Sequence, residues 1–250
     1  MKFIYVIFSF VFFYSNISYA EYVSITTKHE EIQTAYWPQR NSNSVLIWLP
    51  GGDGSFGYAS KNPPKPNWLF SNLAGLENAP DIVFMDSRYG LGWKGGDLSP
   101  RRTSRHIDNV VEVVKYYKEK TQKNVYIFGH SNSSVSVGEF LNAAPENQSL
   151  IAGAIFSASR NETEVRVHLN LPVLVMAHEQ DTNRWTTPSS SLALYEKIKK
   201  KDDANVQFGF VHGGYDEGNP ATSGRHMYAG SLDEAANIVY KFVMETSKTK

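Results

Sequence analysis

The sequence predicts an α/β domain in which a mostly parallel central sheet carries helices on both faces. Continuous apolar runs of strand length alternate along the chain with segments of helical periodicity, and this alternation is typical of parallel sheets covered by helices. The chain has 250 residues, of which 41% are hydrophobic and 13% aromatic. That is enough apolar material for one sizeable core. Long low-complexity runs and internal repeats are absent from the sequence, which argues against a disordered or a solenoid protein.

The first strand-like segments are expected to form an antiparallel pair. They are EYVSITT (21–27) and TAYWPQ (34–39), which are separated by a few polar residues. SVLIWLP (44–50) follows as a short continuous apolar run and stops at Gly51-Gly52.

Five further apolar runs are predicted to be strands buried on both faces of a parallel sheet, because they are continuous rather than alternating. Parallel strands need right-handed crossovers, and ligands then sit beyond their carboxyl ends. The runs are DIVFMDS (81–87), NVYIFGHS (124–131), AGAIFSAS (152–159), LPVLVMAHEQD (171–181) and NVQFGFVHGG (205–214).

Helical periodicity predicts the connections between these strands. Four segments place their apolar residues on one side, at 65–77, 104–120, 191–201 and 232–246, and another helix is expected to begin near Ser133. In the second segment the apolar side is expected to hold Ile107, Val110, Val111, Val114 and Tyr117.

The first twenty residues are predicted to be a signal peptide. Lys2 precedes a nearly unbroken apolar run, and Ser18-Tyr19-Ala20 places small residues where cleavage requires them. The alternative is a membrane anchor, but the run of about a dozen residues is shorter than the roughly 20 needed to span a bilayer. We therefore expect export to the periplasm or out of the cell, with residues 21–250 forming one domain.

Composition excludes several classes of protein. Without Lys2 the mature chain has 24 basic and 25 acidic residues, a net charge of −1, so no basic surplus predicts binding to nucleic acid or to an anionic membrane. Cysteine is absent, which excludes thiol catalysis and thiolate zinc sites. Neither a metal nor a cofactor is predicted.

A serine follows the strand at 124–130 at an abrupt turn. The turn has the sequence Gly129-His130-Ser131-Asn132-Ser133. A tight strand-to-helix turn needs small side chains two residues before and after its apex, and it exposes the apical hydroxyl at a helix N-terminus, where developing negative charge is favoured. A simpler interpretation is that Ser131 only caps the next helix, since serine is a favoured N-cap residue.

This pentapeptide resembles the Gly-x-Ser-x-Gly nucleophile elbow of the α/β-hydrolase superfamily, with Ser133 in place of the last glycine. The similarity is to secreted serine esterases and lipases of that superfamily, and it covers nearly the whole mature chain. It implies the α/β-hydrolase fold and a serine nucleophile, Ser131, followed along the chain by an acid and then by a histidine. The histidine takes the serine proton, and the acid orients the histidine.

The resemblance assigns the acid and the histidine to two turns downstream. Asp181, after the strand at 171–178, matches the acid-bearing turn, with Glu179 as the alternative. His226, in the loop before the last helix, is favoured as the base over His212, which then becomes a core or strand-end histidine. The alternative interpretation is that Asp181 only caps a turn or a helix.

The oxyanion donors implied by the resemblance are two backbone N–H groups. One belongs to Asn132, the residue after the nucleophile, and the other to Gly52. The segment Pro50-Gly51-Gly52 is similar to the His-Gly-Gly motif of the superfamily, with proline in place of histidine. The alternative is an ordinary glycine-rich turn.

The implied activity is hydrolysis of a carboxylic ester through Ser131, His226 and Asp181, with no cofactor. A peptidase or thioesterase with the same residues remains an alternative, and so does a non-catalytic binding protein on this fold. Aromatic side chains in the loops at the carboxyl edge of the sheet are expected either to line the substrate pocket or simply to pack; they are Tyr89, Trp93 and Trp185.

Overall fold

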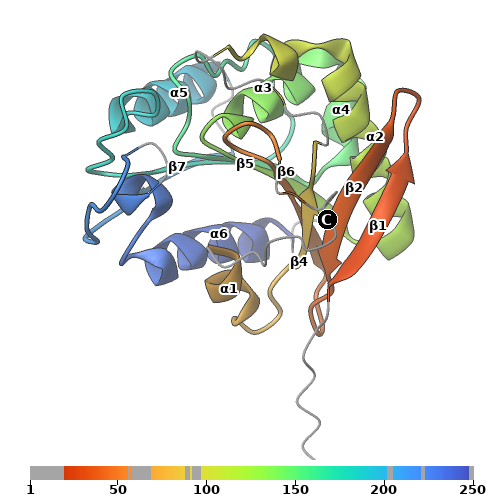
Figure 1. Cartoon of the computed structure of the whole chain (residues 1–250), viewed down its shortest axis with the longest axis horizontal. Coiled ribbons are helices and arrows are strands. Elements are labelled where there is room, and N and C mark those ends of the chain that lie inside the picture. Colours follow the sequence, from red (N-terminus) through yellow and green to blue (C-terminus); the bar gives the residue numbers. More distant parts are fainter. Residues whose placement is uncertain are drawn as a thin grey trace, which may run out of the picture.

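An eight-stranded sheet forms the centre of the described part of the protein (Figure 1). The computed structural model describes residues 20–55, 57, 69–87, 91, 97–201, 205–220 and 223–247. The strand order is β1-β2-β4-β3-β5-β6-β7-β8. The strands are β1 (Glu21–Thr26), β2 (Glu31–Trp37), β3 (Ser44–Leu49), β4 (Asp81–Met85), β5 (Asn124–His130), β6 (Gly153–Ser157), β7 (Val173–His178) and β8 (Val206–Val211).

The sheet is antiparallel at one edge and parallel elsewhere. β1 and β2 form the predicted antiparallel pair, and β2 also runs antiparallel to β4. The other neighbouring strands are parallel. β3, β4, β6 and β7 are buried along their whole length, whereas β1 is mostly exposed. The continuous apolar runs therefore predicted the parallel centre correctly. For β8 the prediction of burial on both faces was wrong: the strand lies at the edge of the sheet, and all of it except Val211 is partly buried or exposed.

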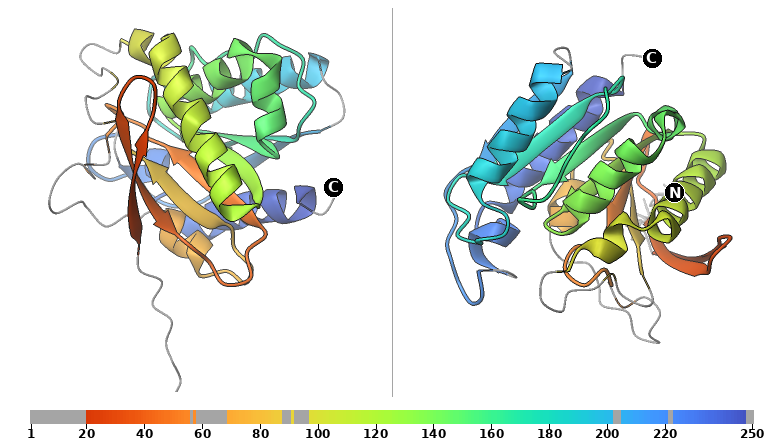
Figure 2. Two further views of the ribbon diagram at one scale, coloured as in Figure 1. Left: turned by 90° about the vertical axis from the view of Figure 1, so that its right-hand side faces the viewer. Right: turned by 90° about the horizontal axis from the view of Figure 1, so that it is seen from above.

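Helices cover both faces of the sheet. α2, α3 and α5 pack on one face and α1 and α6 on the other (Figure 1), and the left-hand view of Figure 2 shows the same division from the side. The helices are α1 (Leu69–Ala74), α2 (Ser104–Thr121), α3 (Ser133–Ala143), α4 (Pro145–Leu150), α5 (Pro188–Lys201) and α6 (Leu232–Thr246), with the 3₁₀ helices η2 (Ser99–Arg102) and η3 (Gly224–Met227).

The helix predictions hold for the long helices, with two corrections. The described part of the helix expected at 65–77 is only the six residues of α1. In α2 the buried side contains Val113, whereas Val111 is only partly buried. Val111 was predicted on the apolar side and Val113 was not, but packing against the sheet buries the valine that faces it, which is Val113.

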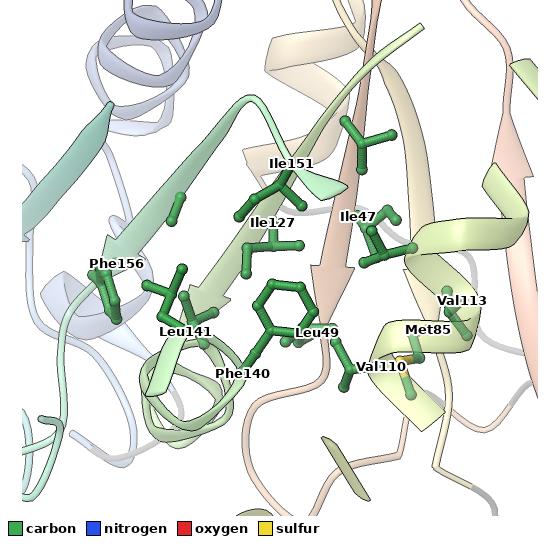
Figure 3. Packing of buried hydrophobic residues seen from close by; sticks show 14 of the residues in the cluster. Ile47, Leu49, Met85, Val110, Val113, Ile127, Phe140, Leu141, Ile151 and Phe156 are labelled. Atoms are coloured by element: carbon green, nitrogen blue, oxygen red, sulfur yellow. The ribbon is translucent and has the colours of Figure 1, made fainter. Parts of the chain in front are cut away.

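Two apolar clusters fill the space between sheet and helices. Figure 3 shows part of the cluster beneath α2 and α3, with Phe140 beside Ile127 and Val110 beside Met85. Burying a side chain of this size stabilises the fold by about 1.5–3 kcal/mol. A core of this extent accounts for a fold that uses no disulfide.

The predicted signal peptide is not tested by the structure. Residues 1–19, which include nearly all of the predicted signal peptide, lie outside the described residues. Within the described ranges, no helix combines the length and the apolar character that crossing a bilayer requires.

Candidate active site

Ser131 lies at the apex of a strained turn between β5 and α3. Its φ is 57°, in the left-handed region that serine rarely adopts. Such a conformation costs on the order of 1–3 kcal/mol and persists only where the surroundings hold it. The Ser131 N–H donates to the Ser157 carbonyl at 3.0 Å, which fixes the turn to β6. The N-cap position of α3 falls on Asn132, and within the described chain no side chain caps this helix. Helix capping therefore does not explain Ser131.

The residues two before and two after Ser131 have different reasons to be small. A Cβ on Gly129 would lie 2.5 Å from the Ser133 carbonyl oxygen and 2.7 Å from a methyl carbon of Val137, so β5 and α3 approach too closely for any side chain. Ser133, by contrast, fits where the superfamily motif has glycine. It is fully buried, and its hydroxyl donates to the His130 carbonyl at 2.8 Å. The departure from the motif thus adds a hydrogen bond across the elbow.

Asp181 and His226 form a buried pair. Asp181 Oδ2 lies 2.9 Å from His226 Nδ1, and the two side chains are 0% and 2% exposed. The carboxylate also accepts from the Asn183 N–H at 2.8 Å and from the Thr186 hydroxyl at 3.1 Å. Because an ionised carboxylate only accepts hydrogen bonds, the Asp181 contact places the ring proton of His226 on Nδ1 and leaves a lone pair on Nε2.

The His226 ring lies beside the elbow. Its centroid is 4.8 Å from the ring centroid of His130, the residue before Ser131. His130 Nδ1 is hydrogen-bonded to Ser157 Oγ at 3.0 Å, and Ser157 Oγ lies 2.7 Å from the Tyr228 hydroxyl. This chain of contacts joins η3 to the ends of β5 and β6.

His212 and Glu179, the alternative base and the alternative acid, lie near each other at the surface. His212 directly follows β8, its side chain is 58% exposed, and its Nδ1 is 2.9 Å from Glu234 Oε1. Glu179 Oε2 lies 3.9 Å from His212 Nε2. The hydrogen bond to Glu234 raises the pKa of His212. His212 is thus the strand-end histidine of the prediction rather than a core residue, because its ring faces carboxylates at the surface.

The Gly51-Gly52 loop packs directly against the elbow. A Cβ on Gly51 would be 3.0 Å from the His130 carbonyl oxygen. Gly52 has φ 51°, and its carbonyl accepts from Asn132 Nδ2 at 2.8 Å. Among the described residues, neither the Gly52 N–H nor the Asn132 N–H has a hydrogen-bond acceptor. Each of these two amides therefore has a donor that no described group accepts.

Comparison with known proteins identifies the fold. No protein-family model and no curated protein matches the sequence. Solved structures do match: an α/β serine hydrolase without a lid from Xanthomonas campestris has a TM-score of 0.62 at 11% identity, covering 93% of this chain and 97% of that one. An esterase from Pyrococcus furiosus has a TM-score of 0.64 at 14% identity, covering 91% and 93%. A dienelactone hydrolase from Anabaena variabilis has a TM-score of 0.63 at 14% identity, covering 91% and 98%.

The chain has the α/β-hydrolase fold. The fold class predicted from the sequence is thereby confirmed. In this α/β-hydrolase fold the candidate residues follow the carboxyl ends of four parallel strands: Gly52 follows β3, Ser131 follows β5, Asp181 follows β7 and His226 follows β8. Ligands of open α/β sheets bind at this edge.

Two buried polar residues near the candidate site of this α/β-hydrolase fold were not predicted from the sequence. Arg101 is completely buried and donates to the loop carbonyls of Pro50, Gly51 and Gly52. His178 Nδ1 accepts from the Gln180 N–H at 3.0 Å, and its Nε2 bonds to the Gly213 carbonyl at 2.9 Å, so the ring joins the Asp181 turn to the loop before η3. No local pattern signals Arg101. His178 ends the strand before the Asp181 turn, and no role was predicted for it from the sequence.

Of the three aromatic residues predicted to line a pocket in this α/β-hydrolase fold, the structure describes only Trp185. Tyr89 and Trp93 lie outside the described residues. Trp185 is half-buried, and its ring packs against two guanidinium groups, with the central carbons of Arg160 and Arg184 at 4.9 and 4.6 Å from the ring centroid. Trp185 therefore has a packing role in the structure, and its contact with a substrate stays a prediction.

Buried neutral histidines should make the stability of this α/β-hydrolase fold sensitive to acid. Burial lowers the pKa of His106 to about 3, and burial also lowers the pKa of His130 and His178. Since the unfolded chain binds a proton near pH 6.5 and folded His106 does not, the free energy of unfolding falls as pH drops below 6.5, by up to about 1.4 kcal/mol per pH unit for each such group. Urea unfolding of His106→Gln should therefore give a shallower pH dependence between pH 6.5 and 5 than the wild type.

His212→Gln is the matched control for this experiment. The pKa of His212 is raised, so protonation of His212 stabilises the fold at low pH, and its removal should make the dependence slightly steeper. A wild-type slope retained in His106→Gln would mean that the buried ring is protonated in the folded protein.

Proposed function

We propose that this protein is a serine hydrolase that transfers an acyl group from a carboxylic ester to water. One observation carries the proposal: the buried Asp181–His226 pair, at 2.9 Å, lies beside the elbow that holds Ser131 in a strained conformation. Strained backbone and a buried carboxylate–imidazole pair both cost free energy, and such costs are typical of catalytic sites.

The reaction would proceed in two acyl-transfer steps. The Ser131 oxygen attacks the ester carbonyl carbon while His226 Nε2 takes the hydroxyl proton, and the Gly52 and Asn132 amides hold the resulting oxyanion. The carbon–oxygen bond to the alcohol then breaks, and the alcohol leaves with the proton from His226. Water, deprotonated by His226, attacks the acyl-enzyme and releases the acid and Ser131. Asp181 stabilises the imidazolium in both steps.

An ester is the favoured substrate because an alcohol leaves more readily than an amine. Among the structures of similar fold, one is described as an esterase and another as a dienelactone hydrolase, which supports hydrolysis of carboxylic esters here. A peptidase or thioesterase would use the same residues and differ only in the substrate cleaved. We also propose export, as the N-terminal segment predicts, and a mature chain that begins at Glu21 would support this.

Labelling with a fluorophosphonate probe tests the proposal directly. We expect the wild type to bind one probe per chain and Ser131→Ala to bind none, because only an activated serine attacks the phosphorus centre. Ser189→Ala is the matched control, since Ser189 is an exposed serine in the first turn of α5, and it should label like the wild type. An unreactive wild type would instead indicate a non-catalytic binding protein.

A substrate panel separates the ester from its alternatives. Short-chain p-nitrophenyl esters, the matching thioesters and the p-nitroanilides should be hydrolysed in decreasing order of kcat/KM, with the esters first. A higher kcat/KM for thioesters or anilides would move the assignment to a thioesterase or a peptidase while leaving the three catalytic residues in place.

A further inference from the structure

Arg101 places a buried cation behind the Gly51-Gly52 loop. Its side chain is 0% exposed. Nη1 donates to the Pro50 carbonyl at 2.9 Å, and Nη2 donates to the carbonyls of Gly51 at 3.3 Å and Gly52 at 3.1 Å. Among the described residues, no carboxylate accepts a hydrogen bond from this guanidinium. Burial lowers the pKa of Arg101 to about 9, so the side chain is still a cation at pH 7.

Three consecutive carbonyls converge on this one group, which fixes where the loop amides point. In a trans peptide the N–H is directed opposite to the carbonyl of the preceding residue. Carbonyls held by Arg101 therefore turn the N–H groups of Gly51, Gly52 and Asp53 away from it. In an extended chain successive carbonyls point to opposite sides. The φ of 51° at Gly52, which glycine adopts readily, lets neighbouring carbonyls point to the same side. Successive N–H groups on one side of a turn form an anion-binding concavity.

The same guanidinium also joins the Gly51-Gly52 loop to α3, the helix that follows Ser131. Nη1 donates to Ser136 Oγ, on α3, at 3.1 Å, and Ser136 Oγ lies 2.9 Å from His106 Nε2. Asn132 Nδ2 makes a second link, to the Gly52 carbonyl. The loop and the elbow are thus held at a fixed separation by side chains from two elements.

We propose that Arg101 is a positioning residue for oxyanion binding, holding the carbonyls of Pro50, Gly51 and Gly52 so that the loop amides face the carbonyl attacked by Ser131. The inference rests on the proposed function. A cation behind the peptide carbonyls also polarises the peptides, and this strengthens their N–H groups as donors. Arginine suits the role because its planar fork contacts several acceptors at once, which a lysine ammonium at the same site cannot match.

The inference is tested by measuring kcat and KM for two Arg101 variants and for a control variant of the neighbouring Arg102. Arg101→Lys and Arg101→Met are compared with Arg102→Met. Arg102 follows in η2, but its side chain is exposed and contacts the Glu162 carbonyl and the Glu139 carboxylate. With p-nitrophenyl butyrate we expect kcat to fall about 100-fold in Arg101→Met, because loss of one oxyanion donor costs 10²–10³ in kcat. KM should change by less than about threefold. Arg101→Lys should lose less, and Arg102→Met should match the wild type.

A transition-state analogue distinguishes positioning from general loss of structure. An alkyl trifluoromethyl ketone forms a tetrahedral adduct with the serine, and its affinity should fall by the same factor as kcat/KM. Adding millimolar guanidinium chloride to Arg101→Ala should restore part of kcat and leave Arg102→Ala unchanged. Arg101→Lys remains decisive if the methionine variant does not fold.

The outcomes separate this inference from the function on which it rests. Suppose that the wild type hydrolyses the ester and the folded Arg101 variants keep kcat within threefold. The proposed positioning role of Arg101 is then wrong, and the proposed hydrolase function is unaffected. A rise in KM with unchanged kcat and unchanged ketone affinity would overturn it as well. A wild type that is inert toward ester and ketone would overturn the proposed function first.

Discussion

His226→Ala should abolish ester hydrolysis, lowering kcat/KM for p-nitrophenyl butyrate by about 10⁴-fold or more. Without the imidazole nothing takes the Ser131 proton, and in serine hydrolases loss of the base costs nearly as much as loss of the whole triad. The buried Asp181 carboxylate would also lose its imidazole partner, so unfolding by urea should be measured in parallel to confirm that the variant is folded at the assay temperature.

His212→Ala provides the matched comparison for this prediction. His212 also follows the strand at the end of the sheet, but its ring is exposed and pairs with Glu234. We expect kcat/KM within about twofold of the wild type. Loss of turnover in His212→Ala together with retained turnover in His226→Ala would show that the base has been assigned to the wrong histidine.

Gly129→Ala should be the most disruptive single-methyl change in the elbow. The added Cβ would lie 2.5 Å from the Ser133 carbonyl oxygen, a backbone atom that can move only if α3 shifts away from β5. Overpacking of this kind costs about 1–3 kcal/mol. The shift would also displace Ser131, and a misplacement of about 1 Å can cost 10²-fold in rate. Urea unfolding and kcat with the same ester measure the two effects.

Gly75→Ala is the control for the elbow glycine. Gly75 follows α1, and a Cβ there would meet nothing nearer than 3.6 Å. We expect the control to unfold at nearly the urea concentration of the wild type. A Gly129→Ala variant of wild-type stability and activity would mean that the elbow can open by several tenths of an ångström without losing its geometry.

Much of the fold was predictable because it follows from local patterns. The strands at 44–49, 81–85 and 173–178 are buried along their whole length, and their sequences contain no polar interruption that would conceal this. The short helices α4 and η2 were not predicted, since six and four residues are too few to establish a 3.6-residue period. The choice between Val111 and Val113 in α2 depends on the angle at which the helix meets the sheet, which periodicity alone does not give.

The site was predictable where the chemistry dictates residue type and order. Ser131, Asp181 and His226 were selected by those criteria, and the structure brings Asp181 and His226 together. Their catalytic roles stay predictions until they are tested. Arg101 could not be found in this way, because its partners at positions 50–52 lie about fifty residues away and are backbone carbonyls, which every sequence contains. Such a contact exists only in three dimensions.

The position of η3, between β8 and the final helix, has a consequence for the newly made chain. His226 comes 95 positions after Ser131, and its turn is anchored by Tyr228 against Ser157. A polypeptide still lacking its last segment therefore contains Ser131 without the imidazole that is proposed to activate it. Under the proposed function, hydrolytic activity would begin only once the tertiary structure is complete and the His226 ring lies beside the elbow.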